Sequence, residues 1–201
     1  MKIKDTVALV TGANRGIGLA FTRELLGRGA RKVYAGDVAL LINNAGVAHL
    51  GGFLAPDSEE VARFLFETNF FGVLRMCKAF APILAANGGG AVLNVLSIAS
   101  WLNRGQLAAY AATKSAAWSL TNSLRYELAA QRTQVLALHM GFVDTDLTEA
   151  IEAPKSSADE IVTRALDALE SGLDEVLADE TTRLAKQALT ALRPSYLPQT
   201  A

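Results

Sequence analysis

Tyr110 and Lys114, four residues apart, are the two side chains in this sequence whose types and spacing best suit acid–base chemistry. On a helix, residues four apart lie on one face, about one turn from each other. A lysine ammonium near a phenol stabilises the phenolate and lowers the tyrosine pKa from its ordinary value of about 10. Such a phenol can exchange a proton near neutral pH. The alternative interpretation is a surface helix with an ordinary tyrosine and lysine.

A serine, Ser97, lies thirteen residues before Tyr110, directly after the apolar run 91–96. That run predicts a strand, so the Ser97 hydroxyl could hydrogen-bond the oxygen that Tyr110 protonates. Ser100 is a nearby rival for this role. A hydrolase with Ser97 as nucleophile is a third hypothesis. Against it, the Gly-x-Ser-x-Gly pattern is absent and no histidine–acid pair stands in a recognisable arrangement.

A glycine-rich turn near the start of the chain suits phosphate binding. The apolar run 6–10 predicts a buried strand, Thr11–Gly18 follows at once, and a helical pattern runs from about Gly16 to Arg28. This order places backbone N–H groups and the positive end of a helix dipole where a pyrophosphate can bind. The spacing is Gly-x-x-x-Gly-x-Gly, not the common Gly-x-Gly-x-x-Gly. A glycine turn that merely links strand to helix is the alternative.

The composition excludes several classes of function. The chain has 201 residues, 51% of them apolar and 19% charged, and a net charge of −1, which predicts one globular domain without a nucleic-acid or membrane surface. A single cysteine, Cys77, and the lack of a signal-peptide pattern at the start predict a cytoplasmic protein. Two histidines, one cysteine and no clustered carboxylates predict that no catalytic metal is bound.

Predicted strands and helices alternate along the chain. Strands are expected at 6–10, 31–35, 40–46, 91–96, 133–139 and 175–178, and helices at 16–28, 57–86, 109–131, 157–171 and 179–192. This alternation predicts an α/β fold with a doubly wound parallel sheet in three layers.

Six motifs, in sequence order, resemble the short-chain dehydrogenase/reductase family. They are Thr11–Gly18, Asn43-Asn44-Ala45-Gly46, Asn69, Ser97, Tyr110 with Lys114, and Met140–Thr145. The resemblance covers nearly the whole chain and implies one Rossmann-like domain over residues 1–201. It implies an NAD(P)-dependent oxidoreductase that interconverts a small-molecule carbonyl compound and a secondary alcohol by hydride transfer. A homodimer or homotetramer, formed through the helices that contain 69–86 and 109–131, is implied as well.

The resemblance also implies roles for individual residues. Tyr110 would be the general acid in reduction and the base in oxidation, and Ser97 would polarise the substrate carbonyl. Lys114 would bind the nicotinamide ribose and lower the pKa of Tyr110, and Asn69 would hold a water in the proton relay to Lys114. The implied cofactor-binding residues are Gly12, Arg15, Gly16, Ile17, Gly18, Asn43, Ala45, Gly46, Tyr110, Lys114, Val143 and Thr145.

Two positions bear on the cofactor. Arg15, within the glycine turn, favours the 2′-phosphate of NADP over NAD, with a solvated turn arginine as the alternative. The family usually has Pro-Gly where this chain has Met140-Gly141. Without that proline we expect a looser turn over the cofactor but the same chemical groups.

The largest departure from the family is a shortening near residues 36–39. The family has a helix, a strand and a helix between its second strand and the Asn-Asn-Ala-Gly strand, where this chain has four residues. In the family the two flanking strands lie parallel on opposite sides of the first strand. The chain would have to return about 17 Å along a strand and cross about 9–10 Å of sheet. Four residues reach at most about 14 Å, so we predict that this sheet edge is missing or rebuilt.

The shortening has a functional consequence, because the missing segment normally forms the adenine pocket. An acidic residue about 20 residues past the glycines often binds the ribose 2′-OH, and Asp37 lies near that distance. Asp37 could equally be a remnant of the third strand or the start of the next one, so it receives no cofactor role. The alternative hypothesis is therefore a catalytically impaired or non-enzymatic protein that has lost the adenine side of its cofactor site.

Overall fold

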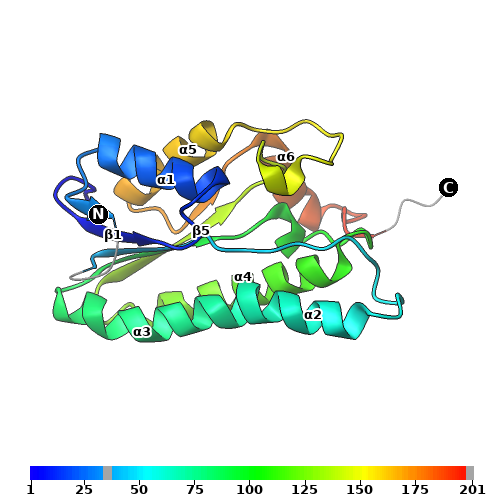
Figure 1. The fold of residues 1–201 in the computed structure, drawn as a ribbon, viewed down its shortest axis with the longest axis horizontal. Helices are drawn as coiled ribbons and strands as arrows, with labels where there is room; N and C mark the ends of the chain where they lie inside the picture. Colours follow the sequence, from blue (N-terminus) through cyan, green and yellow to red (C-terminus); the bar gives the residue numbers. More distant parts are fainter. Residues whose placement is uncertain (34–37, 198–201) are drawn as a thin grey trace.

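The computed structural model describes residues 1–33 and 38–197. Within them a parallel sheet runs in the order β2-β1-β3-β4-β5-β6 (Figure 1). The strands are β1 Val7–Val10, β2 Lys32–Val33, β3 Leu40–Asn43, β4 Gly90–Val95, β5 Thr133–His139 and β6 Glu175–Leu177. The helices are α1 Gly16–Gly27, α2 Ser58–Phe66, α3 Val73–Ala86, α4 Ala108–Glu127, α5 Ala158–Glu170 and α6 Glu180–Gln187. Shorter turns are the π-helical η1 Glu67–Gly72 and the 3-10 turns η2 Ile98–Ser100, η3 Asp146–Thr148 and η4 Ala188–Thr190.

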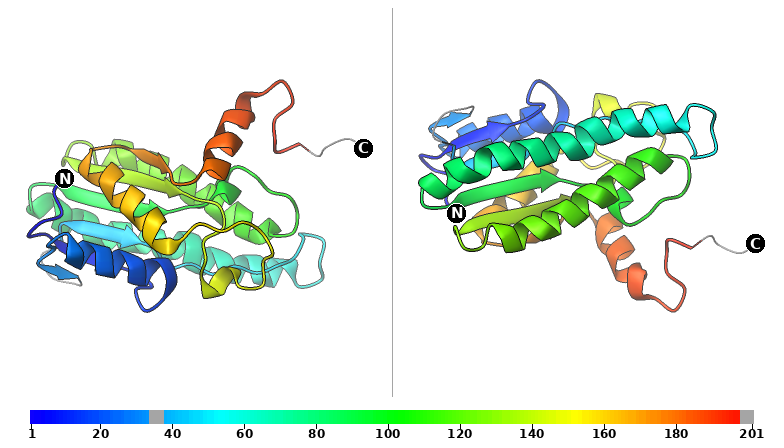
Figure 2. Two further views of the ribbon diagram at one scale, coloured as in Figure 1. Left: turned by 90° about the horizontal axis from the view of Figure 1, so that it is seen from above. Right: turned by 90° about the horizontal axis from the view of Figure 1, so that it is seen from below.

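Helices cover both faces of the sheet, which confirms the predicted three-layer α/β fold (Figures 1 and 2). Side chains of β3 alternate between two cores, as the period of a strand requires. Leu40 and Ile42 pack in the core shared with α1 and α5. Leu41 packs in the core shared with α3 and α4. The sheet is therefore buried on both faces, and its strands are short and apolar.

The predicted helix over 57–86 is present as α2, η1 and α3 in direct succession. By length and composition alone, Ser58–Ala86 is apolar enough to cross a membrane, and 22% of its most apolar window is buried. The core helix of a soluble protein can pass the same test. In this structure α3 packs on β3 and β4. The π-helical turn in the middle carries Asn69, and such turns occur frequently at functional sites.

The shortened edge is confirmed, but the argument that the two flanking strands could not keep their places is wrong. β2 pairs with β1 on the side opposite β3, and all three strands are parallel. Val33 and Leu40 both pair with Ala8, one on each side of β1. The distance argument assumed a second strand of full length, whereas β2 has two residues and the chain has no strand length to retrace. Residues 34–37, including Ala35 and Asp37, lie outside the described residues.

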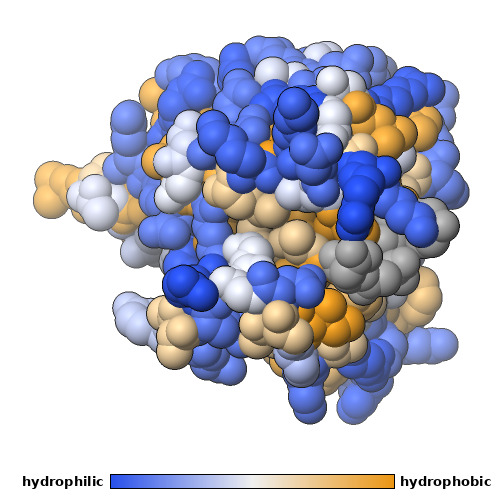
Figure 3. All heavy atoms as spheres, turned by 90° about the vertical axis from the view of Figure 1, so that its left-hand side faces the viewer, coloured by the Kyte–Doolittle hydropathy of each residue, from blue (hydrophilic) through white to orange (hydrophobic). Residues whose placement is uncertain are grey.

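The two ends of the sheet differ. The end shown in Figure 3, opposite the loops that follow the strands, carries mainly hydrophilic side chains with small apolar patches between them. The loops after β1, β3, β4 and β5 gather at the other end. In open α/β sheets that carboxyl end is where ligands bind, so the site is sought there.

Candidate active site

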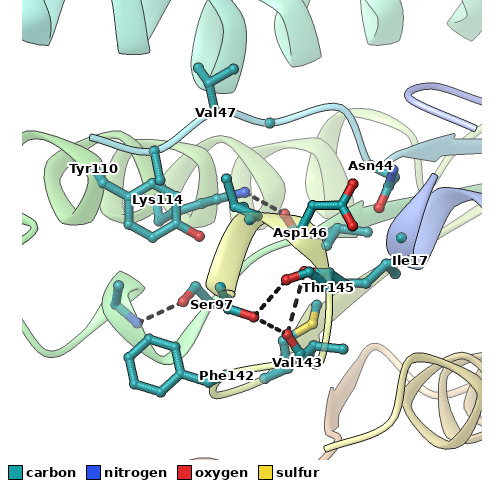
Figure 4. Close-up of a pocket in the computed structure, with 18 of the residues that line it drawn as sticks. Ile17, Asn44, Val47, Ser97, Tyr110, Lys114, Phe142, Val143, Thr145 and Asp146 are labelled. Carbon is teal, nitrogen blue, oxygen red and sulfur yellow. Dashed lines mark hydrogen bonds between the residues drawn. The ribbon is translucent and has the colours of Figure 1, made fainter. Parts of the chain in front are cut away.

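A cavity of about 730 Å³ lies at the carboxyl ends of the strands, within the range of small-molecule and cofactor sites (Figure 4). Most of the predicted site residues line it: Gly12, Arg15, Gly16, Ile17, Ala45, Gly46, Ser97, Tyr110, Lys114, Val143 and Thr145. Three predicted residues, Gly18, Asn43 and Asn69, do not. In Figure 4, Tyr110, Ser97 and Phe142 occupy one end of the view and Ile17, Asn44 and Asp146 the other.

Ser97, Tyr110 and Lys114 come together in this cavity from two elements. Tyr110 and Lys114 are one turn apart on α4, and the Lys114 Nζ lies 5.7 Å from the centre of the Tyr110 ring. Ser97 caps η2 directly after β4, where its Oγ accepts a hydrogen bond from Ala99 N at 3.1 Å. Ser100 is buried outside the cavity, so Ser97 is the serine placed beside Tyr110.

Burial controls the charge states of the pair on α4. Burial lowers the pKa of Lys114 to about 8. Burial also raises the pKa of Tyr110, and its side-chain hydrogen bond with Ser97 opposes this to a smaller extent. The net shift of the Tyr110 pKa is therefore upward, and the lowering expected from Lys114 stays a prediction. The lysine Nζ donates to Val95 O at 2.8 Å and lies over the phenol ring.

Asn69 is fully engaged with the chain. Its Nδ2 donates to Val47 O at 2.8 Å and to Thr113 Oγ1 at 3.0 Å, and its Oδ1 accepts from Val47 N at 2.9 Å. These bonds tie the loop after β3 to α4. A Cβ at Gly46 would lie 3.4 Å from Asn69 Oδ1 and 3.7 Å from Lys114 Nζ. Asn69 thus stands behind the cavity wall next to Lys114, and its role in holding a water stays a prediction.

The start of α1 is built to receive an anion. Gly12 and Gly16 adopt positive φ angles of 63° and 51°, which glycine reaches without strain. Arg15 provides no side-chain cap, and the first turn of α1 holds no acidic residue. The free N–H groups and the positive end of the helix dipole therefore open into the cavity, an arrangement that fits a phosphate.

Gly18 shapes this turn from behind. A Cβ on Gly18 would lie 2.1 Å from Gly12 O and 2.5 Å from Asn44 Nδ2. Only glycine therefore lets α1 approach the turn so closely, although Gly18 does not line the cavity.

Of the asparagine pair after β3, Asn44 and not Asn43 presents its side chain to the cavity. Asn43 is buried and its Nδ2 donates to Asn94 Oδ1 at 2.8 Å. Asn44 Nδ2 donates to Thr11 O at 3.0 Å, which fixes the glycine-rich turn. The strand pattern could have shown this: Ile42 packs under α1, so its neighbour Asn43 must point toward the other layer.

Two residues that hold the site were missed from the sequence, and the first is Asp179. Its Oδ2 accepts a hydrogen bond at 2.6 Å from Gly141 N, in the turn that lines the cavity after β5. Its Oδ1 caps α6 by accepting from the N and Oγ1 of Thr182, both at 2.8 Å. One buried carboxylate thus joins the start of α6 to the wall of the site.

The second missed residue is His139, at the end of β5. It is fully buried, its ring stacks on Trp101 with centres 4.1 Å apart, and its Nδ1 lies 3.2 Å from Ser97 O. Burial lowers the pKa of His139 to about 3, so the ring is neutral and Nδ1 is the donor. His139 therefore contacts the Ser97 carbonyl and not its hydroxyl, which gives the hydrolase hypothesis no nucleophile–base pair.

An ion pair crosses the cofactor end of the cavity. Arg15 Nη1 lies 3.1 Å from Asp146 Oδ2, and both side chains are exposed. The pair links the glycine-rich turn to the loop after β5.

Comparisons with known proteins identify the family of the chain. A family model described as short chain dehydrogenase matches residues 31–156. The 3-oxoacyl-[acyl-carrier-protein] reductase FabG of Vibrio cholerae is 28% identical, and the match covers 79% of this chain and 82% of that protein. Dehydrogenase/reductase SDR family member 4 of Oryctolagus cuniculus is 33% identical, over 76% of this chain and 58% of that protein.

Among solved structures, a short chain dehydrogenase from Burkholderia cenocepacia J2315 in complex with NADP matches with a TM-score of 0.91 and 38% identity. That match covers 95% of each chain. The family model spans well over half of the sequence, and the predicted motifs lie at the carboxyl end of the predicted sheet. The chain belongs to the short-chain dehydrogenase family of oxidoreductases.

Proposed function

We propose that this protein is an NAD(P)-dependent oxidoreductase that interconverts a small carbonyl compound and a secondary alcohol. The observation that carries the proposal is the meeting of Ser97, Tyr110 and Lys114 in one cavity with the uncapped, glycine-rich start of α1. A proton donor and a phosphate-binding turn in one cavity are what hydride transfer to a carbonyl requires.

The residues present suit such a cofactor. Gly12, Gly16 and Ile17 would hold its phosphates, Lys114 its nicotinamide ribose, and Val143 with Thr145 its carboxamide end. When bound, the cofactor supplies or accepts the hydride, while the protein positions and polarises.

NADP is the preferred form in this proposal, because Arg15 stands in the glycine turn. Its present partner, Asp146, is exposed like Arg15 itself. An exposed ion pair contributes only about 0–1 kcal/mol, so Arg15 can exchange the carboxylate for a 2′-phosphate at little cost. The related B. cenocepacia structure, which contains NADP, supports this preference.

The two pKa shifts indicate which group donates the proton and which group stabilises the anion that remains. Because burial raises its pKa, Tyr110 stays protonated at neutral pH and can give its proton to the carbonyl oxygen in reduction. Ser97 donates a hydrogen bond to that oxygen, which stabilises the negative charge that develops there. Lys114, still largely charged at pH 7, stabilises the phenolate that remains. In oxidation the phenolate takes the proton back.

The proposal extends to the whole protein: one domain, located in the cytoplasm, that forms a homodimer or homotetramer through α2–η1–α3 and α4. The single cysteine, Cys77, is a buried free thiol, which suits a reducing compartment. Phe64 and Phe71 are exposed on the helices of the proposed interface.

The alternative function is a protein that kept its catalytic residues but no longer binds the dinucleotide, and the two-residue β2 is the observation that favours it. A titration of the folded protein with NADPH and NADH, followed by nicotinamide fluorescence, separates the two. We expect saturable binding, tighter for NADPH. No binding to a protein that melts cooperatively would support the alternative.

The catalytic assignment is tested with Tyr110→Phe. This variant should bind NADPH like the wild type and lose about 10²–10⁴-fold in kcat, the usual contribution of general acid catalysis. Unchanged turnover would overturn the mechanism.

A further inference from the structure

Two loops with apolar side chains line the cavity, and Leu50, Leu147 and Phe142 on them are 64%, 53% and 38% exposed. The first wall joins the loop after β3 to the segment before α4. Gly51 N donates to Gln106 O at 2.8 Å, and Ala108 N donates to Gly51 O at 3.1 Å. These bonds bring Leu50 and Leu107 to one wall, one turn before Tyr110, and both line the cavity.

The second wall is the loop after β5. Ser156 N donates to Phe142 O and Asp144 N to Ser156 O, both at 2.9 Å, so the loop is closed at its base. Leu147 and Ile151 line the cavity from this loop. Phe142 also lines the cavity, and in Figure 4 its ring is seen at the end of the view away from Ile17 and Asn44.

The charged side chains of the cavity are already engaged. Among the described residues that line it, these are Arg15, Lys114 and Asp146. Arg15 pairs with Asp146 at the cofactor end, and the buried Lys114 ammonium donates to Val95 O. His49, also on the lining, is exposed at the rim. A carboxylate or phosphate on the substrate would thus contact these apolar side chains without gaining a cationic partner.

We propose that the substrate is an uncharged carbonyl compound whose carbonyl carries an apolar group, aryl or branched alkyl, that packs against Leu50, Leu107, Phe142, Leu147 and Ile151. This inference rests on the proposed function and narrows it to a substrate class. Carbonyl acids and phosphorylated carbonyl compounds are poor substrates.

Two ketones of nearly equal shape test the inference: 4-methylacetophenone, which is neutral, and 4-acetylbenzoate, which is anionic. With NADPH as cofactor, we expect kcat/KM to favour the neutral ketone by at least about tenfold, the discrimination expected when a charge enters an apolar pocket. Comparable kcat/KM values, or a preference for the anion, would overturn the inference.

A gain of charge provides the second test. Leu147→Arg should shift the preference toward 4-acetylbenzoate by about tenfold, because it supplies the missing cation. The matched control is Leu192→Arg, since Leu192 is fully exposed and outside the cavity. An equal shift in both variants would show that the net charge of the protein, and not the wall, sets the preference.

Ligand binding separates this inference from the proposed reaction. Saturation-transfer NMR on Tyr110→Phe, with and without NADPH, reports binding of each ketone without turnover. Preferential binding of the neutral ketone supports the apolar wall even if no reaction occurs, whereas equal binding, or binding of neither ketone, overturns it. Failure of the reaction itself would appear as neutral-ketone binding with no NADPH oxidation in the wild type.

Discussion

Burial shifts the pKa values of Lys114 and Tyr110 in opposite directions, lowering that of Lys114 and raising that of Tyr110. Because the pKa of Lys114 falls from 10.5 to about 8, the ammonium is present below that pH and is lost above it. We predict that NADPH affinity weakens by about tenfold as the pH rises through this value, the cost of losing one charged hydrogen-bond donor. Fluorescence titrations across this pH range measure it. Lys114→Met should bind weakly at every pH, and a persistent step near pH 8 in that variant would contradict the assignment.

His139 links the same site to acid stability. Its pKa is about 3 in the folded protein against an ordinary 6.5, so between these values only the unfolded chain binds the proton. Burial is the main cause of the low pKa, and the nearby cations Lys186, Arg125 and Lys114 lower it further. The free energy of unfolding should therefore fall by about 1.4 kcal/mol per pH unit below pH 6.5 from this residue.

The measurement for His139 is urea unfolding at several pH values on the acid side. His139→Asn keeps a donor for the Ser97 carbonyl but cannot titrate, so its acid slope should be shallower than that of the wild type by that amount. His49→Asn is the matched control, because His49 is exposed. Equal slopes for the wild type and His139→Asn would refute the argument.

The packing of α1 against the glycine-rich turn depends on Gly18. A methyl group there would overlap Gly12 O, so Gly18→Ala must push the helix away from the turn and misplace the N–H groups that open into the cavity. We expect a loss of about 1–3 kcal/mol in stability, as for other overpacked sites, together with loss of NADPH binding.

Gly27 at the other end of α1 supplies the control for Gly18, because a Cβ there would meet nothing within 4 Å. Gly27→Ala should preserve NADPH binding and leave stability equal or slightly higher, because alanine has a higher helix propensity than glycine. Urea unfolding measures the stability of both variants, and titration with NADPH measures their cofactor binding. Normal binding by Gly18→Ala would show that the close approach is not needed.

The turn after β5 lacks the proline common in the family, and Asp179 at the start of α6 restrains it instead. Asp179→Ala should raise the KM for NADPH by about tenfold, because the hydrogen bond from Gly141 N to a charged oxygen is lost. A smaller change in kcat is expected. Thr182→Val removes a cap contact but leaves the Gly141 bond, so it should lower stability without changing KM. Equal KM changes in both variants would mean that α6 acts only through stability.

The elements were predictable where the pattern is local. β5 has the predicted bounds of 133–139, and the predicted helix over 57–86 is present. The predicted end of the last helix was wrong, because α6 ends at Gln187 instead of 192, and part of the predicted strand over 31–35 lies outside the described residues. In the site, Tyr110, Lys114 and Ser97 form motifs, but Asp179 contacts a turn 38 residues earlier in the chain. No spacing rule exposes such a contact, since only the order of β5 and β6 creates it.

The strand order of the sheet explains how the fold tolerates the shortening near 36–39. The sheet loses material only beyond β2, at its edge, while the strands that carry the cavity stay paired in register from β1 to β6. The glycine turn, Ser97 and Tyr110 all belong to this intact part. We therefore expect the shortening to affect the adenine side of the proposed cofactor site, and to change cofactor affinity more than the geometry of proton transfer.

The last prediction concerns exposed aromatic side chains on the layer formed by α2, η1, α3 and α4. Phe64 and Phe71 are 62% and 40% exposed, and Tyr126 on α4 is 87% exposed. The family resemblance implies that these helices form the subunit interface, and a stable interface buries about 1,200–2,000 Å² in total. We expect a dimer or tetramer by light scattering after size exclusion, and a smaller species for Phe64→Glu with Phe71→Glu. Leu192→Glu, an equally exposed site on the C-terminal segment, should not change the mass. A monomeric wild type would contradict the predicted dimer or tetramer.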